Sequence, residues 1–168
     1  MNDSRSRKKA VFDTNVVLQA TLSGRGPSFA ALRLLEEGTI VGVLSPQARQ
    51  EYEDVLNRPA VRQKNPHLTP ERIQLFLDRM ESRAEMVTVI RPYLQYPRDP
   101  KDEPFLNLAI QERADFIVSR DRDLLDLDDS RDFRLLYPFL RIVDPLAFLQ
   151  IIEQTAPPIS DTPQKETE

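Results

Sequence analysis

The sequence predicts an α/β fold with a central, mostly parallel sheet flanked by helices. Short apolar runs alternate along the chain with longer stretches whose apolar residues recur at helical spacing. Parallel strands need long crossover connections that usually carry a helix, so this alternation favours a parallel sheet. The length of 168 residues fits a single domain with a sizeable core.

The first half of the chain predicts two strands and two helices in alternation. Apolar runs at 10–12 and 40–44 are typical of short buried strands. A helix is expected from 27 to Gly38 and another over 46–56, and each begins with a proline, which suits the first turn of a helix.

The middle of the chain predicts the clearest helix, over 69–84. Thr69 followed by proline and glutamate is a good start signal, and the apolar residues after it keep i, i+3, i+4 spacing. A third strand is expected at 86–90, and a loop with three prolines at 91–101.

The last third predicts two more strands and the helices around them. The expected strands are 116–118 and 140–143. The expected helical segments are 105–110, a short turn at 121–125, and 145–152.

The chain is expected to divide into one domain and two ends. The domain covers 9–153, preceded by a flexible basic segment at 1–8. Residues 154–168 are rich in proline and contain one large apolar residue, so we expect a disordered tail. No apolar segment follows the basic start and no apolar run approaches a membrane span, which predicts a cytoplasmic protein without membrane contact.

Composition excludes several kinds of chemistry. The absence of cysteine rules out disulfides, thiolate metal sites and a cysteine nucleophile. His67 is the only histidine, and it lies in a connecting loop where we expect a surface residue. With 27 acidic residues, hydrolytic chemistry would fall to carboxylates, which suit a hard cation such as Mg²⁺ or Mn²⁺.

Four acids have positions that surface exposure does not explain well. Asp13 and Asp121 follow apolar strands, and ligands of open α/β sheets bind at the carboxyl ends of strands. Asp102 and Glu51 fall toward the apolar faces of their expected helices, where an unpaired charge is costly. The alternatives are a helix cap for each aspartate and, for Glu51, an ion pair with an arginine.

If these four carboxylates converge on one crevice, they repel one another unless a cation neutralises them. Mg²⁺ takes oxygen ligands and bridges carboxylates to phosphate oxygens. Such a site activates water against a phosphodiester, so the acids alone predict a nuclease.

Four segments in order resemble the PIN domain family, and within it the VapC-like toxins of bacterial type II toxin–antitoxin systems. V-F-D-T-N at 11–15 is similar to the family's strand and D-T-N, and E-Y-E-D-V-L at 51–56 to its second acidic helix. D-P-K-D at 99–102 and the run F-I-V-S-R-D-R-D-L-L at 116–125 resemble its third and fourth elements.

This resemblance implies an RNase H-like three-layer fold and a ribonuclease that depends on Mg²⁺ or Mn²⁺. The implied catalytic and metal-binding residues are Asp13, Glu51, Asp102 and Asp121. Further candidate ligands are Asp123, Asp99 and Glu103, and the supporting residues are Thr14, Asn15 and Ser119. The chain departs from the family pattern in having Ser119 for threonine, Arg120 for glycine and Glu103 for asparagine.

The expected substrate is single-stranded or looped RNA, which suits a narrow crevice better than a duplex. Its phosphates would meet a basic rim, for which the candidates are Arg25, Arg98, Lys101, Arg120 and Arg122. The resemblance also implies a cognate antitoxin and a homodimer or higher homo-oligomer. Leu75 widens the apolar face of the 69–84 helix, which fits either a dimer surface or a broader core contact.

Two other functions remain open on the sequence alone. One is a catalytically silent PIN-like module that binds RNA or a partner. The other is a phosphatase of the haloacid-dehalogenase type, because V-F-D-T-N places an aspartate after a strand, although Asn15 stands where that family needs a second aspartate.

Overall fold

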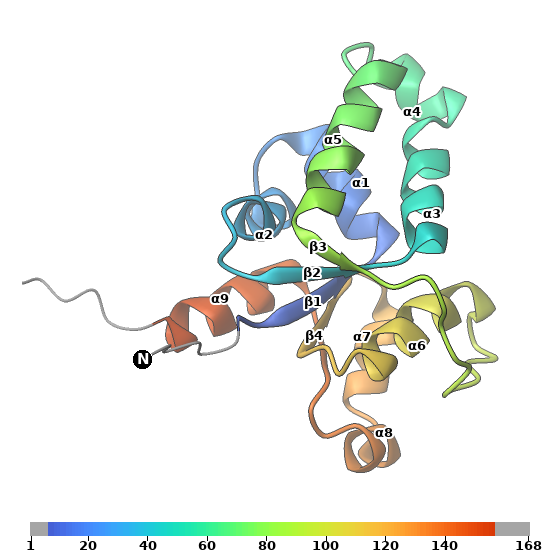
Figure 1. Ribbon diagram of the computed structural model, residues 1–168, viewed down its shortest axis with the longest axis vertical. Helices are drawn as coiled ribbons and strands as arrows, with labels where there is room; N and C mark the ends of the chain where they lie inside the picture. Colours follow the sequence, from blue (N-terminus) through green and yellow to red (C-terminus); the bar gives the residue numbers. More distant parts are fainter. Residues whose placement is uncertain (1–6, 157–168) are drawn as a thin grey trace, which may run out of the picture.

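The computed structural model describes residues 7–156, which form a five-stranded sheet with helices packed around it (Figure 1). The strand order is β3-β2-β1-β4-β5, and every neighbouring pair is parallel. The strands are β1 Lys9–Phe12, β2 Val41–Leu44, β3 Ala84–Met86, β4 Phe116–Val118 and β5 Arg141–Val143. The expected α/β class and flanking helices are confirmed, and the sheet is wholly parallel.

The helices fill the crossover connections between strands. In chain order they are α1 Thr14–Ser23, α2 Pro27–Glu36, α3 Pro46–Leu56, α4 Pro59–Lys64, α5 Pro70–Ser82, α6 Glu103–Gln111, α7 Arg122–Asp128, α8 Arg131–Leu136 and α9 Pro145–Thr155, with the 3₁₀ turn η1 at Pro100–Asp102. Helices α4 and α8 were not expected from the sequence, and α1 was implied only by the alternative that Asp13 caps a helix. Both are short, and α8 exposes Leu135 and Leu136 instead of showing a clear apolar stripe.

The core lies between the sheet and these helices. Phe148 of α9 contacts Phe12 and Phe116 edge-on, at centroid distances of 6.1 and 5.3 Å. Helix α6 packs along β1, β2 and β4. Residues of β1 and β4 from Ala10 to Phe12 and Phe116 to Val118 are almost fully buried, which is why both strands read as continuous apolar runs.

The third strand lies at Ala84–Met86, so the expectation of a strand at 86–90 was wrong. It pairs with β2 from Gly42 to Leu44, and the last backbone bond to β2 is donated by Val87. Beyond that point β2 has ended, and residues 88–96 are held by side chains of α6. Gln111 binds Val89 and Arg91, Asn107 binds Tyr93 and Leu94, and Glu103 binds Tyr96.

The ends of the chain were expected to be flexible. Most of the expected flexible segments, 1–8 and 154–168, lies outside the described residues. Helix α9 continues to Thr155. None of the helices formed by residues 7–156 is both long and apolar enough to cross a bilayer.

Candidate metal centre

The carboxyl ends of β1 and β4 meet at the point where the strand order reverses direction. Chain order runs outward from β1 to β2 and β3 on one side, and from β4 to β5 on the other. Open α/β sheets bind ligands in the crevice at such a reversal. Asp13 follows β1 and Asp121 follows β4 after two residues, so both lie at this crevice.

Ser119 joins these two acids. Its hydroxyl donates to Asp13 Oδ2 at 2.6 Å and accepts from the Asp121 backbone N–H at 2.9 Å. Ser119 is fully buried and its own N–H binds the Val143 carbonyl at 3.0 Å, which fixes it to the sheet. The hydroxyl therefore orients the Asp13 carboxylate relative to the start of α7.

Helix capping explains Asp121 in part and does not explain Asp13. Asp121 Oδ1 accepts from the Asp123 N–H at 2.8 Å, while its other oxygen remains for a ligand. Asp13 occupies the N-cap position of α1, but its side chain makes no capping bond and lies only 4% exposed.

Asp102 is buried with fewer stabilising contacts than Asp13 or Asp121. It precedes α6 without capping it, is 6% exposed, and its Oδ2 is buried without a hydrogen-bond partner among residues 7–156. Asp99 lies one 3₁₀ turn earlier and accepts from the Lys101 N–H at 3.1 Å. A buried carboxylate oxygen without a donor points to a cation or a proton as its partner.

Glu51 lies on α3, half-buried beside the end of β1. Its neighbour Tyr52 donates its hydroxyl to the Phe12 carbonyl, which holds α3 against this strand. Glu51 forms no ion pair with an arginine among residues 7–156. Arg49 pairs instead with Glu53, Asp78 and Glu81, and Arg58 acts on Glu51 only through its charge.

The pKa values of these acids show that they share one electrostatic environment. Burial raises the pKa of Asp102 to about 7, and the negative charges of Asp13, Asp99, Asp121 and Glu51 add to the rise. Burial also raises the pKa of Asp13, against the stabilising bond from Ser119, and raises that of Glu51. The charges of the neighbouring acids therefore disfavour ionisation of Asp102, Asp13 and Glu51, and a bound divalent cation would offset this repulsion.

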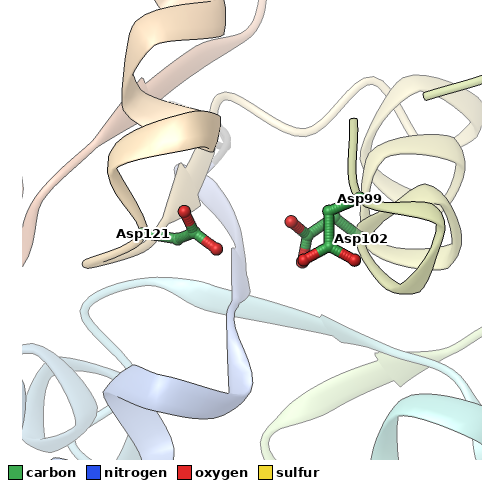
Figure 2. Close-up of side chains that lie close together, drawn as sticks. All are labelled: Asp99, Asp102 and Asp121. Carbon is green, nitrogen blue, oxygen red and sulfur yellow. The ribbon is translucent and has the colours of Figure 1, made fainter. Parts of the chain in front are cut away.

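Figure 2 shows Asp121 facing Asp99 and Asp102 across the crevice. One carboxylate oxygen from each of the three lies within 4.8 Å of the others. The Thr14 hydroxyl is also buried, beside the carboxyl of Glu51, and it lowers the pKa of that carboxyl against the effect of burial. Carboxylate and hydroxyl oxygens are the ligands of Mg²⁺ and Mn²⁺, so the donor set fits a hard divalent cation.

Two of the further candidate ligands are engaged elsewhere. Asp123 forms an ion pair with Arg98 at 2.8 Å. Glu103 accepts from the Tyr96 N–H at 2.7 Å, so its carboxylate holds the segment that leads to Asp99. The proposed supporting residue Asn15 is exposed on α1.

The candidate RNA-binding residues separate into two groups. Arg25, Arg120 and Arg122 line one cavity of about 550 Å³ beside the crevice. Arg98 is paired with Asp123, and Lys101 lies near Glu51, where its charge lowers the pKa of that carboxyl. His67 is exposed, in agreement with the sequence.

Sequence reasoning missed the residues that build the surroundings of the site. Asn107 and Gln111 fix the segment before Asp99, yet an amide on a helix gives no signal of a bond to a distant backbone. The spacing of Glu103, Asn107 and Gln111, each four residues apart, was the available hint that one polar face of α6 binds something. Gln19 and Ser28, which line the arginine cavity, were also missed.

The fold and the acids at its reversal point define an α/β protein with a carboxylate site suited to a divalent cation. Comparison with known protein families identifies the family. The PIN domain model matches residues 9–123, and the chain belongs to this family. Members of the family are typically metal-dependent nucleases.

One relative is an uncharacterized protein of Methanocaldococcus jannaschii, MJ1680. It is 29% identical to this chain over 149 residues, which cover 87% of this chain and 92% of the relative. No solved structure matches the chain significantly.

Proposed function

We propose that the chain is a metal-dependent endoribonuclease that hydrolyses RNA phosphodiesters, and that it acts as the toxin of a toxin–antitoxin pair. The nuclease proposal depends above all on Asp102, whose buried Oδ2 has no hydrogen-bond partner within residues 7–156 and whose pKa is raised to about 7 among four other carboxylates. Membership of the PIN domain family supports the same activity.

Asp102, Asp121 and Asp13 would hold Mg²⁺ or Mn²⁺, with Asp99 and Glu51 beside them. The bound cation would supply charge neutralisation and a water activated against the phosphodiester. Ser119 fixes Asp13 and the backbone of Asp121 together, so these two acids stay in place when the substrate arrives.

A half-buried Glu51 with a raised pKa is suited to take a proton at a crevice that excludes part of the solvent. We assign it the role of general base or outer ligand, and the buried Tyr52 keeps it in reach of Asp13. RNA is the substrate that the resemblance to PIN toxins favours.

The activity is tested by incubating single-stranded RNA with Mn²⁺ and three purified chains: wild type, Asp13→Asn, and the control Asp132→Asn, whose carboxylate is exposed on α8. We expect cleavage by wild type and the control, and a loss of at least about a hundredfold in Asp13→Asn. Equal cleavage by all three would point to a contaminating nuclease and contradict the proposal.

A catalytically silent module would show neither cleavage nor calorimetric binding of Mn²⁺. No feature of the described residues favours it over the nuclease.

The toxin role is tested in a bacterial host. Growth arrest on expression of wild type, its absence with Asp13→Asn, and relief by the small protein encoded beside the chain would support it. That protein would be the antitoxin. Growth unaffected by active nuclease would instead indicate a housekeeping enzyme.

A second copy of the chain, packed through the exposed Leu75 face of α5, is the other partner that we propose, and sedimentation tests it.

A further inference from the structure

A basic cavity adjoins the carboxylate crevice. Arg25, Arg120 and Arg122 line it together with residues of α1, α2 and α9, at a volume of about 550 Å³. Arg120 and Arg122 are the chain neighbours of Asp121 on either side, while Arg25 lies in the loop between α1 and α2. The cavity and the crevice therefore share the segment that follows β4.

The three arginines of this cavity form no ion pair among the described residues. Arg25 and Arg122 form no ion pair with any of residues 7–156, and Arg120 binds only the neutral amide of Gln19, at 3.0 Å. Asp144 is the acid among the described lining residues, and one of its oxygens caps α9 by accepting from the Ala147 N–H. Three guanidinium groups against one carboxylate are notable in a protein of net charge −4.

Guanidinium groups suit phosphate, because their donors form a rigid fork that matches its oxygens. The remaining wall of the cavity is less polar. Pro27, Pro145 and Leu146 contribute apolar surface, and Leu146 is 54% exposed. The volume lies within the range of about 300–1,000 Å³ that small-molecule sites occupy. A ligand with one anionic end and a flat, partly apolar body fits both walls.

We propose that this cavity binds a nucleotide of the RNA strand next to the scissile phosphate. The phosphate of that nucleotide contacts Arg25, Arg120 and Arg122, and its base or ribose lies against Pro27 and Leu146. This assignment rests on the proposed nuclease function. The cavity supplies an attraction for RNA that the acidic crevice lacks, because five carboxylates repel a polyanion and adjacent arginines attract it.

The test measures the affinity of the full chain for a fluorescent single-stranded RNA in EDTA, so that no cleavage occurs. Arg25→Gln, Arg120→Gln and Arg122→Gln are compared with wild type and with Arg131→Gln, an exposed arginine of α8 outside the cavity. Each lost phosphate contact reduces the slope of log K against log salt by about 0.7, which corresponds to about fivefold weaker binding at 0.1 M salt. Arg131→Gln is expected to bind as wild type does.

Equal RNA affinity and equal salt dependence in all five proteins would overturn the proposal. So would loss of binding to a polyglutamate peptide in the three cavity variants with RNA binding unchanged, because the cavity would then serve an acidic protein partner. With Mn²⁺ present, the cavity variants are expected to raise KM about fivefold while kcat stays within twofold.

The two proposals fail in different ways. Binding in EDTA gives its result whether or not the chain cleaves RNA, whereas the nuclease proposal fails through wild-type cleavage that Asp13→Asn retains.

Discussion

Replacing Asp102 with asparagine is expected to stabilise the metal-free protein near neutral pH. The side chain is nearly buried, one oxygen has no partner among the described residues, and its pKa is raised to about 7 from the ordinary 3.8. Asparagine keeps the shape of the side chain and removes the charge, so the repulsion from Asp13, Asp99, Asp121 and Glu51 disappears.

The sign follows from proton binding. Below about pH 4 the carboxyl is protonated in both states and contributes nothing to the pH dependence. Between about pH 4 and 7 the unfolded chain releases the proton while the folded chain retains it, so wild-type stability falls as pH rises. Above about pH 7 both states are ionised and the loss is complete.

The magnitude follows from the same pKa. A pKa of Asp102 raised from 3.8 to about 7 corresponds to a loss of about 4 kcal/mol in the free energy of unfolding once the carboxyl is ionised. The crevice opens partly to solvent, which screens the charges, so we expect Asp102→Asn to exceed wild type by about 1–3 kcal/mol at pH 7.5.

Urea unfolding in EDTA at pH 4 to 8 measures this difference, with the exposed Asp132→Asn as the control. Adding Mn²⁺ is expected to reverse the order, because the ion binds the folded wild type and binds the variant weakly. The reasoning about this carboxyl would be refuted if the free energies of unfolding of wild type and Asp102→Asn changed with pH in the same way. A variant less stable than wild type at pH 7.5 would refute it as well.

Three further substitutions test the surroundings of the site. Glu103→Ala removes the bond to the segment before Asp99, so we expect about tenfold weaker Mn²⁺ binding by calorimetry, and unchanged affinity would show that Glu103 does not position that segment. Ser119→Ala leaves Asp13 and the Asp121 N–H without their shared partner and is expected to cost about 1–3 kcal/mol in urea unfolding; a neutral result would contradict the bridging role. Asp128, the last residue of α7, is buried, pairs with Arg141 at 3.1 Å and accepts from the Ile142 N–H at 2.8 Å. Asp128→Asn weakens this pairing and is expected to lower stability by about 2–4 kcal/mol without changing Mn²⁺ affinity, whereas a change in affinity would place Asp128 in the site's network.

The sheet could be predicted because its signals are local. The buried runs before Asp13 and around Ile117 are apolar on both faces, as strands covered by helices must be, and proline marks the starts of several helices. That Asp13 and Asp121 end up at one crevice follows from the rule that parallel strands align their carboxyl ends. Their catalytic roles remain predictions.

The roles of the remaining charged residues depended on tertiary contacts. Glu103 has a suitable residue type and a suitable position in the chain for a ligand, yet its carboxylate is occupied by a backbone N–H seven residues earlier. Asp123 is similarly occupied by Arg98. Arg25 and Arg120 line the same cavity because the loop after α1 packs near the end of β4. The apolar periodicity of the sequence carries no information about that tertiary contact.

The central claim is that these carboxylates hold a divalent cation, and diffraction from crystals soaked in Mn²⁺ tests it most directly. We predict an anomalous peak bound by oxygens of Asp102 and Asp121, with Asp13 or Asp99 beside it, and no peak there in Asp102→Asn. A crevice without a peak in wild type, at Mn²⁺ concentrations that support RNA cleavage, would contradict the account.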